Sequence, residues 1–194
     1  MKRAIDLLGA TLGLIALAPI FLIIGLAILL EDGRPVLFRQ SRAGLDGTPF
    51  RIVKFRTMRR DADDLREQLR AHNEVRGAAF KMTEDPRVTR LGRLLRRFSL
   101  DELPQLWNVL RGEMSLVGPR PHPFDDIARY EPWHNARLSA KPGMTGLWQV
   151  SSRRDANFDR WVEQDIEYIL GWSVWLDIQI LLKTLPAVLR ADGR

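Results

Sequence analysis

The longest apolar stretch of the chain runs from residue 7 to residue 30 and contains no charged side chain. It exceeds the ~18–20 apolar residues that are typical of a transmembrane helix. A secretory signal peptide is disfavoured, because the apolar core is too long and Glu31 and Asp32 follow it in place of a small-residue cleavage site. Basic residues lie on both sides of the stretch, which are Lys2, Arg3, Arg34, Arg39 and Arg42. The pattern predicts a helix that enters a membrane.

Pro19 interrupts this stretch near its middle. Proline removes the helical hydrogen bond to the carbonyl of Ile15 and kinks the helix there. Each arm would hold about 12 residues and reach ~18 Å, which is too short to cross ~30 Å of hydrocarbon. The basic flanks also disfavour a span, because positive flanks tend to stay in the cytoplasm. The residues alone favour a re-entrant helix, broken at Pro19, that dips into one leaflet and returns, with a kinked span as the alternative.

Alternating apolar and polar residues predict a β-hairpin over residues 35–56. Residues 35–40 read as a short strand, and residues 50–56 alternate apolar with basic side chains. Asp46-Gly47 between them is a strong turn signal. Lys54, on the second strand, is a candidate phosphate ligand, although a solvated strand face explains a single lysine equally well.

Helical patterns mark three further segments. Residues 61–76 are polar with mixed charge, which predicts a solvated surface helix. Residues 157–170 predict a helix rich in acidic and aromatic side chains, and residues 170–189 predict a more apolar one. Tryptophans border the apolar face of the last segment, which is typical of a membrane interface or, equally, of a core helix.

A basic amphipathic helix is predicted after Pro86. Apolar residues recur there at helical spacing, and five arginines lie between them: Arg87, Arg90, Arg93, Arg96 and Arg97. Such a helix is typical of a lipid interface. The net charge of the chain is +6, which indicates an anionic lipid, a phosphorylated substrate or nucleic acid as a partner. Because no nucleic-acid-reading motif is recognisable, we expect no nucleic-acid partner.

The composition fits one folded domain with an attached membrane helix. The 194 residues are 45% hydrophobic and 28% charged, which allows a packed core and disfavours bulk disorder. We predict a compact α/β, mainly α, catalytic domain over residues 34–194 and a membrane helix over residues 1–33. The absence of cysteine excludes disulfides and thiolate ligands, and the three histidines show no zinc-motif spacing.

Two adjacent carboxylates, Asp101 and Glu102, are the most informative feature of the sequence. Ser99-Leu-Asp-Glu102 matches a capping box, in which the Glu102 side chain would reach back to the Ser99 amide. The local pattern alone favours this reading. Pro104 complicates it, because a proline so early would kink the new helix. The two acids would then lie at an irregular helix start.

A functional reading gives the two carboxylates different roles. One carboxylate can attack phosphorus and form a covalent intermediate. The other can hold Mg²⁺, which bridges to substrate phosphates. Arg96 and Arg120 are the candidates that neutralise phosphoryl oxygens. The residues alone therefore suggest metal-dependent phosphoryl chemistry at a membrane.

Several short motifs occur in order along nearly the whole chain. They are Lys2-Arg3-Ala-Ile-Asp6, Lys54-Phe-Arg-Thr-Met58, Asp85-Pro-Arg-Val-Thr-Arg90, Ser99-Leu-Asp-Glu-Leu-Pro-Gln-Leu106, Ser115-Leu-Val-Gly-Pro-Arg-Pro121 and Lys141-Pro-Gly-Met-Thr-Gly-Leu-Trp-Gln149. In this order they resemble the monotopic polyprenyl-phosphate phosphoglycosyl transferases, a family of bacterial sugar transferases. The resemblance implies transfer of a sugar-1-phosphate from a UDP-sugar to undecaprenyl phosphate, with release of UMP.

The resemblance also implies roles for individual residues. Asp101 would be the nucleophile that forms a phosphosugar-aspartate, and Glu102 would bind Mg²⁺. Arg120 would contact the nucleotide or its phosphates. Four further residues match polar positions of the family's active-site region, namely Lys54, Arg96, Gln149 and Asp165.

The same resemblance implies a setting for the chemistry. Pro19 matches the break of the family's re-entrant helix, although Ala18 replaces the serine that commonly precedes it. The enzyme would lie in the bacterial inner membrane, in contact with lipid and with its catalytic domain on the cytoplasmic face. The long segment from Met58 to Asp85 is similar to exopolysaccharide-initiating members, which suggests a hexose. The oligomeric state stays open, a homo-oligomer included.

Two rival functions use the same residues. A membrane-associated Mg²⁺-dependent phosphatase or pyrophosphatase would need the same carboxylates. A non-catalytic, basic, membrane-anchored scaffold would need Asp101 and Glu102 only as a helix cap.

Overall fold

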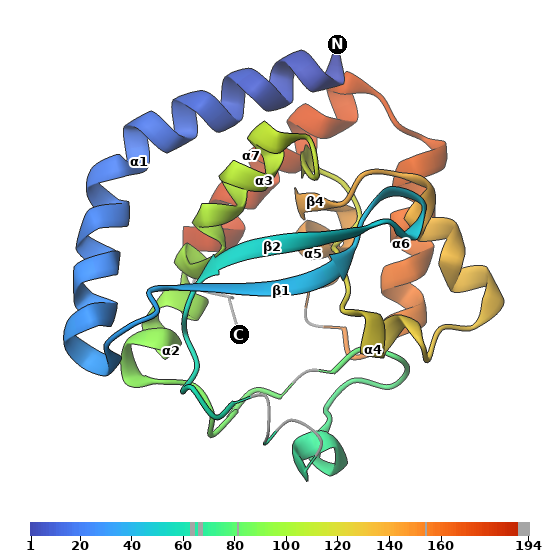
Figure 1. The fold of residues 1–194 in the computed structure, drawn as a ribbon. Coiled ribbons are helices and arrows are strands. Elements are labelled where there is room, and N and C mark those ends of the chain that lie inside the picture. The colour runs from blue at the N-terminus through green and yellow to red at the C-terminus, as the bar shows by residue number, and fades with distance from the viewer. Residues whose placement is uncertain (63–64, 66–67, 81, 154, 190–194) are drawn as a thin grey trace.

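A computed structural model describes residues 1–62, 65, 68–80, 82–153 and 155–189 (Figure 1). Helices dominate the described residues, as predicted, and the two sheets are small. The strands are β1 (Leu37–Ala43), β2 (Pro49–Phe55), β3 (Ser115–Val117) and β4 (Gly143–Thr145). The α-helices are α1 (Lys2–Asp32), α2 (Arg90–Arg97), α3 (Leu106–Arg111), α4 (Phe124–Ile127), α5 (Leu147–Ser151), α6 (Phe158–Leu170) and α7 (Val174–Leu189).

The predicted hairpin crosses the middle of the domain (Figure 1). Strands β1 and β2 pair antiparallel, with Leu37 opposite Phe55 and Ala43 opposite Pro49. Asp46 lies in the connecting turn, where the sequence placed it. The inward side of β2 packs into an apolar cluster with α1 and α3, formed by Ala10, Phe50, Ile52, Leu106, Val109 and Met114. The hairpin therefore carries Lys54 on a strand that is held rigidly by the core.

Helix α1 is continuous but bent. It runs from Lys2 to Asp32 with Pro19 inside it, and Figure 1 shows that its two halves point in different directions as it wraps around the domain. The predicted break is therefore a bend, because a proline removes one hydrogen bond and the flanking turns keep theirs. By length and composition α1 could cross a membrane, and little of its apolar window is buried.

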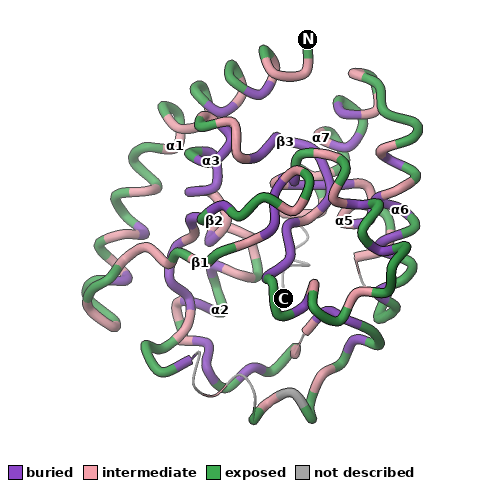
Figure 2. Tube along the Cα trace, turned by 45° about the vertical axis from the view of Figure 1, so that its right-hand side comes forward, coloured by how far each residue is buried: buried purple, intermediate pink, exposed green. Residues whose placement is uncertain are grey.

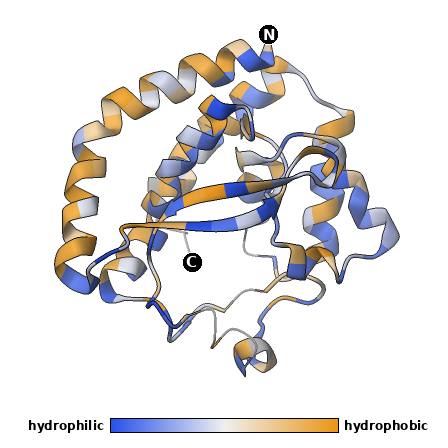
Figure 3. Ribbon diagram, in the orientation of Figure 1, coloured by the Kyte–Doolittle hydropathy of each residue, from blue (hydrophilic) through white to orange (hydrophobic). Residues whose placement is uncertain are grey.

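The outer surface of α1 is apolar and uncovered. Figure 3 shows hydrophobic residues along most of the helix, and Figure 2 shows exposed residues along its outer side. Leu12, Ile15, Leu22 and Ile23 are each more than half exposed. Gly9 and Gly13 face inward, against Leu116 and Leu106 of the domain. So large an exposed apolar surface is typical of a surface that meets lipid or another protein.

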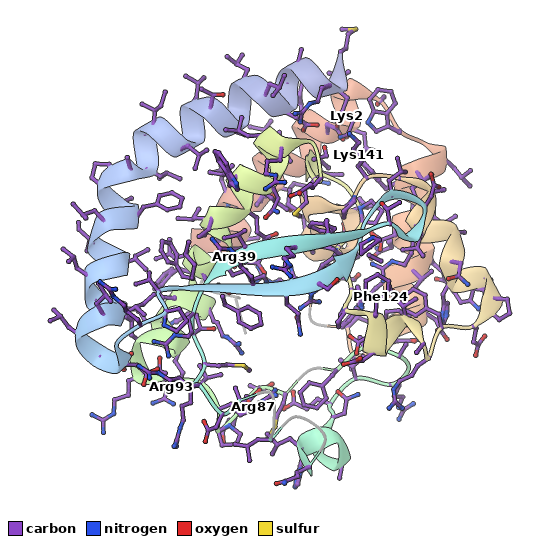
Figure 4. All side chains as sticks on the ribbon, in the orientation of Figure 1. Lys2, Arg39, Arg87, Arg93, Phe124 and Lys141 are labelled. Carbon is purple, nitrogen blue, oxygen red and sulfur yellow. The ribbon has the colours of Figure 1, made fainter. Side chains whose placement is uncertain are left out.

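Both ends of α1 are bonded to the same folded domain. At the start, Lys2 donates to Asp177 of α7 (2.6 Å) and to the carbonyl of Val117 (2.9 Å), and Figure 4 shows Lys2 beside α7. At the other end, Asp32 accepts a hydrogen bond from Arg56, while Glu31 accepts from the amide of Leu91 (3.1 Å). The predicted division at residue 33 coincides with the end of the helix, but the two parts share one core.

A second sheet, which the sequence did not predict, pairs β3 with β4 in parallel. The two strands are only three residues long, and their backbones come very close together. A Cβ atom on Gly143 would lie 2.1 Å from the amide nitrogen of Gly118. Only glycine permits this approach, which explains glycine in both the Val-Gly-Pro-Arg and Lys-Pro-Gly-Met segments.

The surface helix predicted over residues 61–76 is wrong where the structure describes that segment. A short 3₁₀ helix occupies Gln68–His72, and residues 63, 64, 66 and 67 lie outside the described residues. The side-chain Nδ2 of Asn73 donates to the main-chain carbonyls of Val75 and Ala79, at 2.9 Å in both cases. An asparagine side chain that bonds nearby carbonyls in this way competes with helix formation.

Candidate active site

Asp101 and Glu102 lie on a 3₁₀ helix, Leu100–Gln105, rather than at the start of a capped α-helix. The predicted capping box is wrong, because Ser99 has a left-handed backbone and its side chain makes no cap bond. The Glu102 carboxylate turns towards the hairpin instead. Pro104 lies within the 3₁₀ helix, and α3 begins only at Leu106. The irregular start that Pro104 predicted is therefore present.

Glu102 is held by two cations. Its Oε1 accepts hydrogen bonds from Lys54 Nζ (2.7 Å) and Arg120 Nη2 (2.6 Å), while Oε2 accepts from Arg120 Nη1 at 3.3 Å. Burial alone would raise the pKa of Glu102, but the charges and hydrogen bonds of Arg120 and Lys54 lower that pKa far below its usual range. Glu102 is therefore ionised and firmly oriented.

Asp101 differs from its neighbour. It is buried, yet no side chain within the described part of the chain donates a hydrogen bond to its carboxylate. Burial raises the pKa of Asp101, and the charges of Lys54 and Arg96 partly oppose that rise. An anion that is desolvated, near cations and without hydrogen bonds is more reactive than one in water.

The two carboxylates open into a cavity of about 580 Å³. Strand β2 contributes Lys54, helix α2 contributes Arg96, and the segment after β3 contributes Arg120. Helix α5 adds Gln149, which donates to the carbonyl of Met144 at 3.4 Å. Six predicted site residues thus line one cavity, which are Lys54, Arg96, Asp101, Glu102, Arg120 and Gln149.

The three cations of the cavity differ in their electrostatic environments. Burial lowers the pKa of Lys54, against the attraction of Glu102. Burial likewise lowers the pKa of Arg96, against the charge of Asp101, and its Nε donates to Thr57 Oγ1 (2.9 Å). The charge of Glu102 raises the pKa of Arg120. All three side chains line the same cavity as the two carboxylates.

Asp165 is not part of the cavity wall as far as the structure describes it. It is fully buried on α6 and pairs with Arg137, and burial raises its pKa to about 6. The same Arg137 guanidinium donates to the main-chain carbonyl of Arg120 at 3.1 Å. Asp165 therefore lies behind the site and supports the loop that carries Arg120.

Several cavity residues were not predicted as site residues, and Arg87, which was assigned to the basic helix, lies before α2 begins at Arg90. Asp85 and Arg87 form a buried ion pair (2.6 Å) on the segment before α2, and Figure 4 shows where Arg87 lies. Trp148 stacks on Trp161 with ring centroids 4.5 Å apart. The surrounding motifs were the signal for Asp85, Arg87 and Trp148, because each lies within a quoted motif.

His122 lines the cavity as a neutral group. Burial and the charge of Arg137 lower its pKa well below its usual range. It directly follows the Gly-Pro-Arg-Pro segment, so its position beside Arg120 could have been read from the sequence.

The carboxylates have the capacity to hold a divalent cation. Glu102 Oε1 accepts two hydrogen bonds, whereas Oε2 accepts one long bond. Because each carboxylate oxygen has two lone pairs, Glu102 Oε2 and the Asp101 carboxylate remain available as ligands. Among the residues that the structure describes, no cluster of three or more acidic or histidine side chains could hold a metal. A sparse set fits Mg²⁺, which usually takes one or two carboxylates, water and substrate phosphates.

The family comparison shows which family this chain belongs to. The family model for bacterial sugar transferases matches residues 1–191. The chain belongs to the bacterial sugar transferase family. The resemblance inferred from the motifs is confirmed, and the carboxylate pair lies inside the matched region.

Individual relatives of this bacterial sugar transferase are similar over almost its whole length. Galactosyl transferase CpsE of Streptococcus agalactiae serotype III (strain NEM316) is 46% identical over 195 residues, which are 99% of this chain and 43% of CpsE. Exopolysaccharide production protein ExoY of Rhizobium meliloti (strain 1021) is 42% identical over 197 residues, covering 99% of this chain and 87% of ExoY.

A third relative carries a more explicit name. UDP-glucose:undecaprenyl-phosphate glucose-1-phosphate transferase of Caulobacter vibrioides (strain ATCC 19089 / CIP 103742 / CB 15) is 45% identical over 202 residues, covering 99% of this chain and 71% of that protein. The chain spans less than half the length of CpsE. The family is therefore shown for the part that the relatives share with this bacterial sugar transferase.

Proposed function

We propose that this chain transfers a hexose-1-phosphate from a UDP-hexose to undecaprenyl phosphate and releases UMP. The difference between the two carboxylates is the observation that supports this most strongly. Glu102 is bonded by Lys54 and Arg120, whereas Asp101 faces the same cavity without a hydrogen-bond donor from the described residues. One acid is thus held as an electrostatic anchor, and the other is left to react.

The proposed reaction has two steps that share one phosphorus atom. An oxygen of Asp101 attacks the phosphorus that bears the hexose, and the bond from that phosphorus to the UMP oxygen breaks. UMP leaves with the bond's electron pair, and the hexose phosphate is now an acyl phosphate on Asp101. A phosphate oxygen of undecaprenyl phosphate then attacks the same phosphorus, which forms the lipid diphosphate and returns Asp101 as a carboxylate.

The surrounding cations stabilise the charge that moves during each step. Arg96 and Arg120 can neutralise the equatorial phosphoryl oxygens, and Lys54 keeps Glu102 ionised and oriented. Glu102 Oε2 would hold Mg²⁺, which would supply further neutralisation of the substrate phosphates when bound. The burial of Asp101 would limit the access of water, which could otherwise hydrolyse the acyl phosphate.

The relatives' names support a hexose donor. CpsE is named a galactosyl transferase, and the Caulobacter vibrioides relative is named for glucose-1-phosphate transfer from UDP-glucose to undecaprenyl phosphate. ExoY is named for exopolysaccharide production. We propose UDP-glucose or UDP-galactose as the donor, with an exopolysaccharide or glycoconjugate as the downstream product.

The direct test is a donor assay with both products measured. The purified protein is incubated with undecaprenyl phosphate, Mg²⁺ and a panel of UDP-sugars, and UMP and lipid-linked sugar are quantified. With a UDP-hexose we expect equal amounts of UMP and lipid-linked sugar. Without the lipid we expect at most one UMP per enzyme molecule. Phosphate release that is independent of the lipid would favour a phosphatase. Folded protein without turnover on any donor would favour a scaffold.

We further propose that α1 is re-entrant and that both of its ends lie on the cytoplasmic face of the inner membrane. The contacts at its two ends support this: Lys2 bonds to Asp177, and Asp32 bonds to Arg56 of the same folded domain. A straight helix of 31 residues would be ~46 Å long and would place its ends on opposite sides of a bilayer.

Cysteine labelling tests this topology, since the chain has no native cysteine. Ala4→Cys and Arg34→Cys lie on either side of the apolar stretch, and both side chains are exposed. We expect a membrane-impermeant maleimide to label both variants in inside-out vesicles and neither in intact cells. Ile15→Cys, in the centre of the apolar surface, is the control and should resist labelling from either side. If the two end variants were labelled from opposite sides of the membrane, α1 would be a kinked transmembrane span.

The pH dependence of the first step should report Asp101. The attacking form is the carboxylate, and burial raises its pKa. We expect single-turnover UMP release, measured without undecaprenyl phosphate, to fall with decreasing pH at values above the ordinary aspartate pKa of about 3.9. Omitting the lipid removes the titration of its own phosphate. An acid limb at or below that ordinary value would argue against a desolvated nucleophile.

A further inference from the structure

Ser99 has a backbone conformation that serine rarely adopts. Its φ of 54° and ψ of 23° are left-handed. Among the described residues the other non-glycine residue with a positive φ is Asp46, which lies in the hairpin turn. Aspartate tolerates this conformation in turns better than serine does. Contacts with neighbouring residues must therefore hold Ser99 in place.

The position of Ser99 gives this conformation a consequence for the site. Ser99 joins α2 to the 3₁₀ helix that carries Asp101. Its amide donates to the carbonyl of Arg96 (2.9 Å), and its carbonyl accepts from the amide of Glu102 (3.2 Å). The left-handed residue thus ends α2 and turns the chain towards the cavity. If Ser99 relaxed to a right-handed conformation, the direction of the 3₁₀ helix and the placement of both carboxylates would change.

One side chain from a distant segment holds Ser99. Arg153 Nη2 donates to Ser99 Oγ at 3.1 Å, across 54 positions of sequence. Arg153 follows α5, and both Arg153 and Ser99 line the cavity. The neighbouring Ser152 is bonded to Gln164 of α6, so the arginine extends from a segment that is itself anchored.

We infer that Arg153 is a positioning residue that holds Ser99 left-handed and thereby presents Asp101 to the substrate phosphate. The inference rests on the proposed function. Arg153 acts through Ser99, and the reacting atoms are touched by Asp101. Arg153 follows α5, whose Trp148 and Gln149 line the same cavity.

A mutant cycle tests the inference, because glycine adopts the left-handed conformation without support. The variants are Arg153→Met, Arg153→Lys, Ser99→Gly and the double variant Ser99→Gly/Arg153→Met. Arg160→Met is the matched control, since Arg160 is exposed on α6 and pairs with the exposed Glu163 of the same helix. The measurements are kcat, KM for the UDP-hexose and the melting temperature.

We expect Arg153→Met to lower kcat about 10-fold or more, with KM changed less than about 3-fold. Arg153→Lys should recover part of kcat, because lysine can still donate to Ser99 Oγ. In the Ser99→Gly background the loss caused by Arg153→Met should shrink to less than about 3-fold. Arg153→Met should likewise lower the melting temperature less in the Ser99→Gly background than in the wild type. Arg160→Met should change neither kcat nor the melting temperature.

Two results would overturn the inference. An equal loss of kcat in both backgrounds would mean that Arg153 does not act through Ser99, and a rise in KM at unchanged kcat would make it a substrate ligand. The melting-temperature comparison does not depend on turnover. An inactive wild type would therefore refute the proposed function, while equal melting shifts in both backgrounds would refute the Arg153–Ser99 coupling alone.

Discussion

Asp101→Asn should abolish turnover and leave the fold intact. The amide has the shape of the carboxylate but cannot attack phosphorus, so both UMP release and lipid-linked product should fall about 10³-fold or more. The acyl phosphate should disappear with them. Intact-mass spectrometry of wild-type protein mixed with UDP-hexose alone should show an added hexose phosphate, and the variant should show none.

The same variant should be at least as stable as the wild type. Burial raises the pKa of Asp101, which means that the folded state binds the proton more tightly than the unfolded chain does. Above that pKa the ionised carboxylate therefore lowers the free energy of unfolding. A neutral amide removes this cost, so the melting temperature should stay equal or rise. Reactive groups at active sites commonly lower the stability of the fold.

Asp46→Asn is the matched control for Asp101→Asn. Asp46 is exposed in the hairpin turn, where asparagine also tolerates the left-handed conformation. The control should retain turnover and stability. Turnover near the wild-type level in Asp101→Asn, with the control normal, would show that another group attacks the phosphorus.

The carboxylate pair shows what local sequence could and could not predict. Ser99 and Glu102 have the spacing of a capping box, but the segment forms a 3₁₀ helix in which Ser99 makes no cap bond. The competing partners of Glu102 are Lys54 and Arg120, 48 and 18 positions away. A local sequence pattern indicates a possible bond to a nearby amide, but it contains no information about cations on other elements. The charged bonds are stronger, so the tertiary partners prevail.

Asp165 illustrates a different limit. The resemblance placed Asp165 among the polar positions of the family's active-site region. The sequence could not show that Asp165 lies behind the cavity, paired with Arg137, and not in its described wall. Its role depends on Arg137, which bonds both Asp165 and the main chain of Arg120. Such a support is visible only when three segments are brought together by folding.

The parts that were predicted well depend on short-range physics. The hairpin follows from alternation and Asp46-Gly47, and α2 follows from apolar residues at helical spacing among arginines. The bend of α1 follows from Pro19. The parallel pairing of β3 with β4 was missed because two three-residue strands have no periodicity to read. Close approach at Gly118 and Gly143 was its one local signal.

Glu102→Gln should lower turnover about 100-fold or more and, unlike Asp101→Asn, should also destabilise the fold. Glu102 Oε1 is the shared acceptor of Lys54 and Arg120, and a neutral amide removes the counter-charge that is bonded to both partly buried cations. Breaking a buried ion pair from one side costs about 3–5 kcal/mol, and we expect the lower end because Arg120 is partly exposed. The melting temperature of this variant should therefore fall.

The opposite stability effects of the two changes separate the roles of adjacent residues. Each variant replaces a carboxylate by its own amide, so size and shape are matched and only charge is lost. Glu102→Gln should also raise the Mg²⁺ concentration needed for half-maximal turnover, because Glu102 Oε2 would be a ligand. Glu163→Gln, exposed on α6, should change neither quantity. An unchanged Mg²⁺ requirement in Glu102→Gln would move the ion to Asp101 and the substrate phosphates, while a stable variant would contradict the anchoring of Glu102 by its cations.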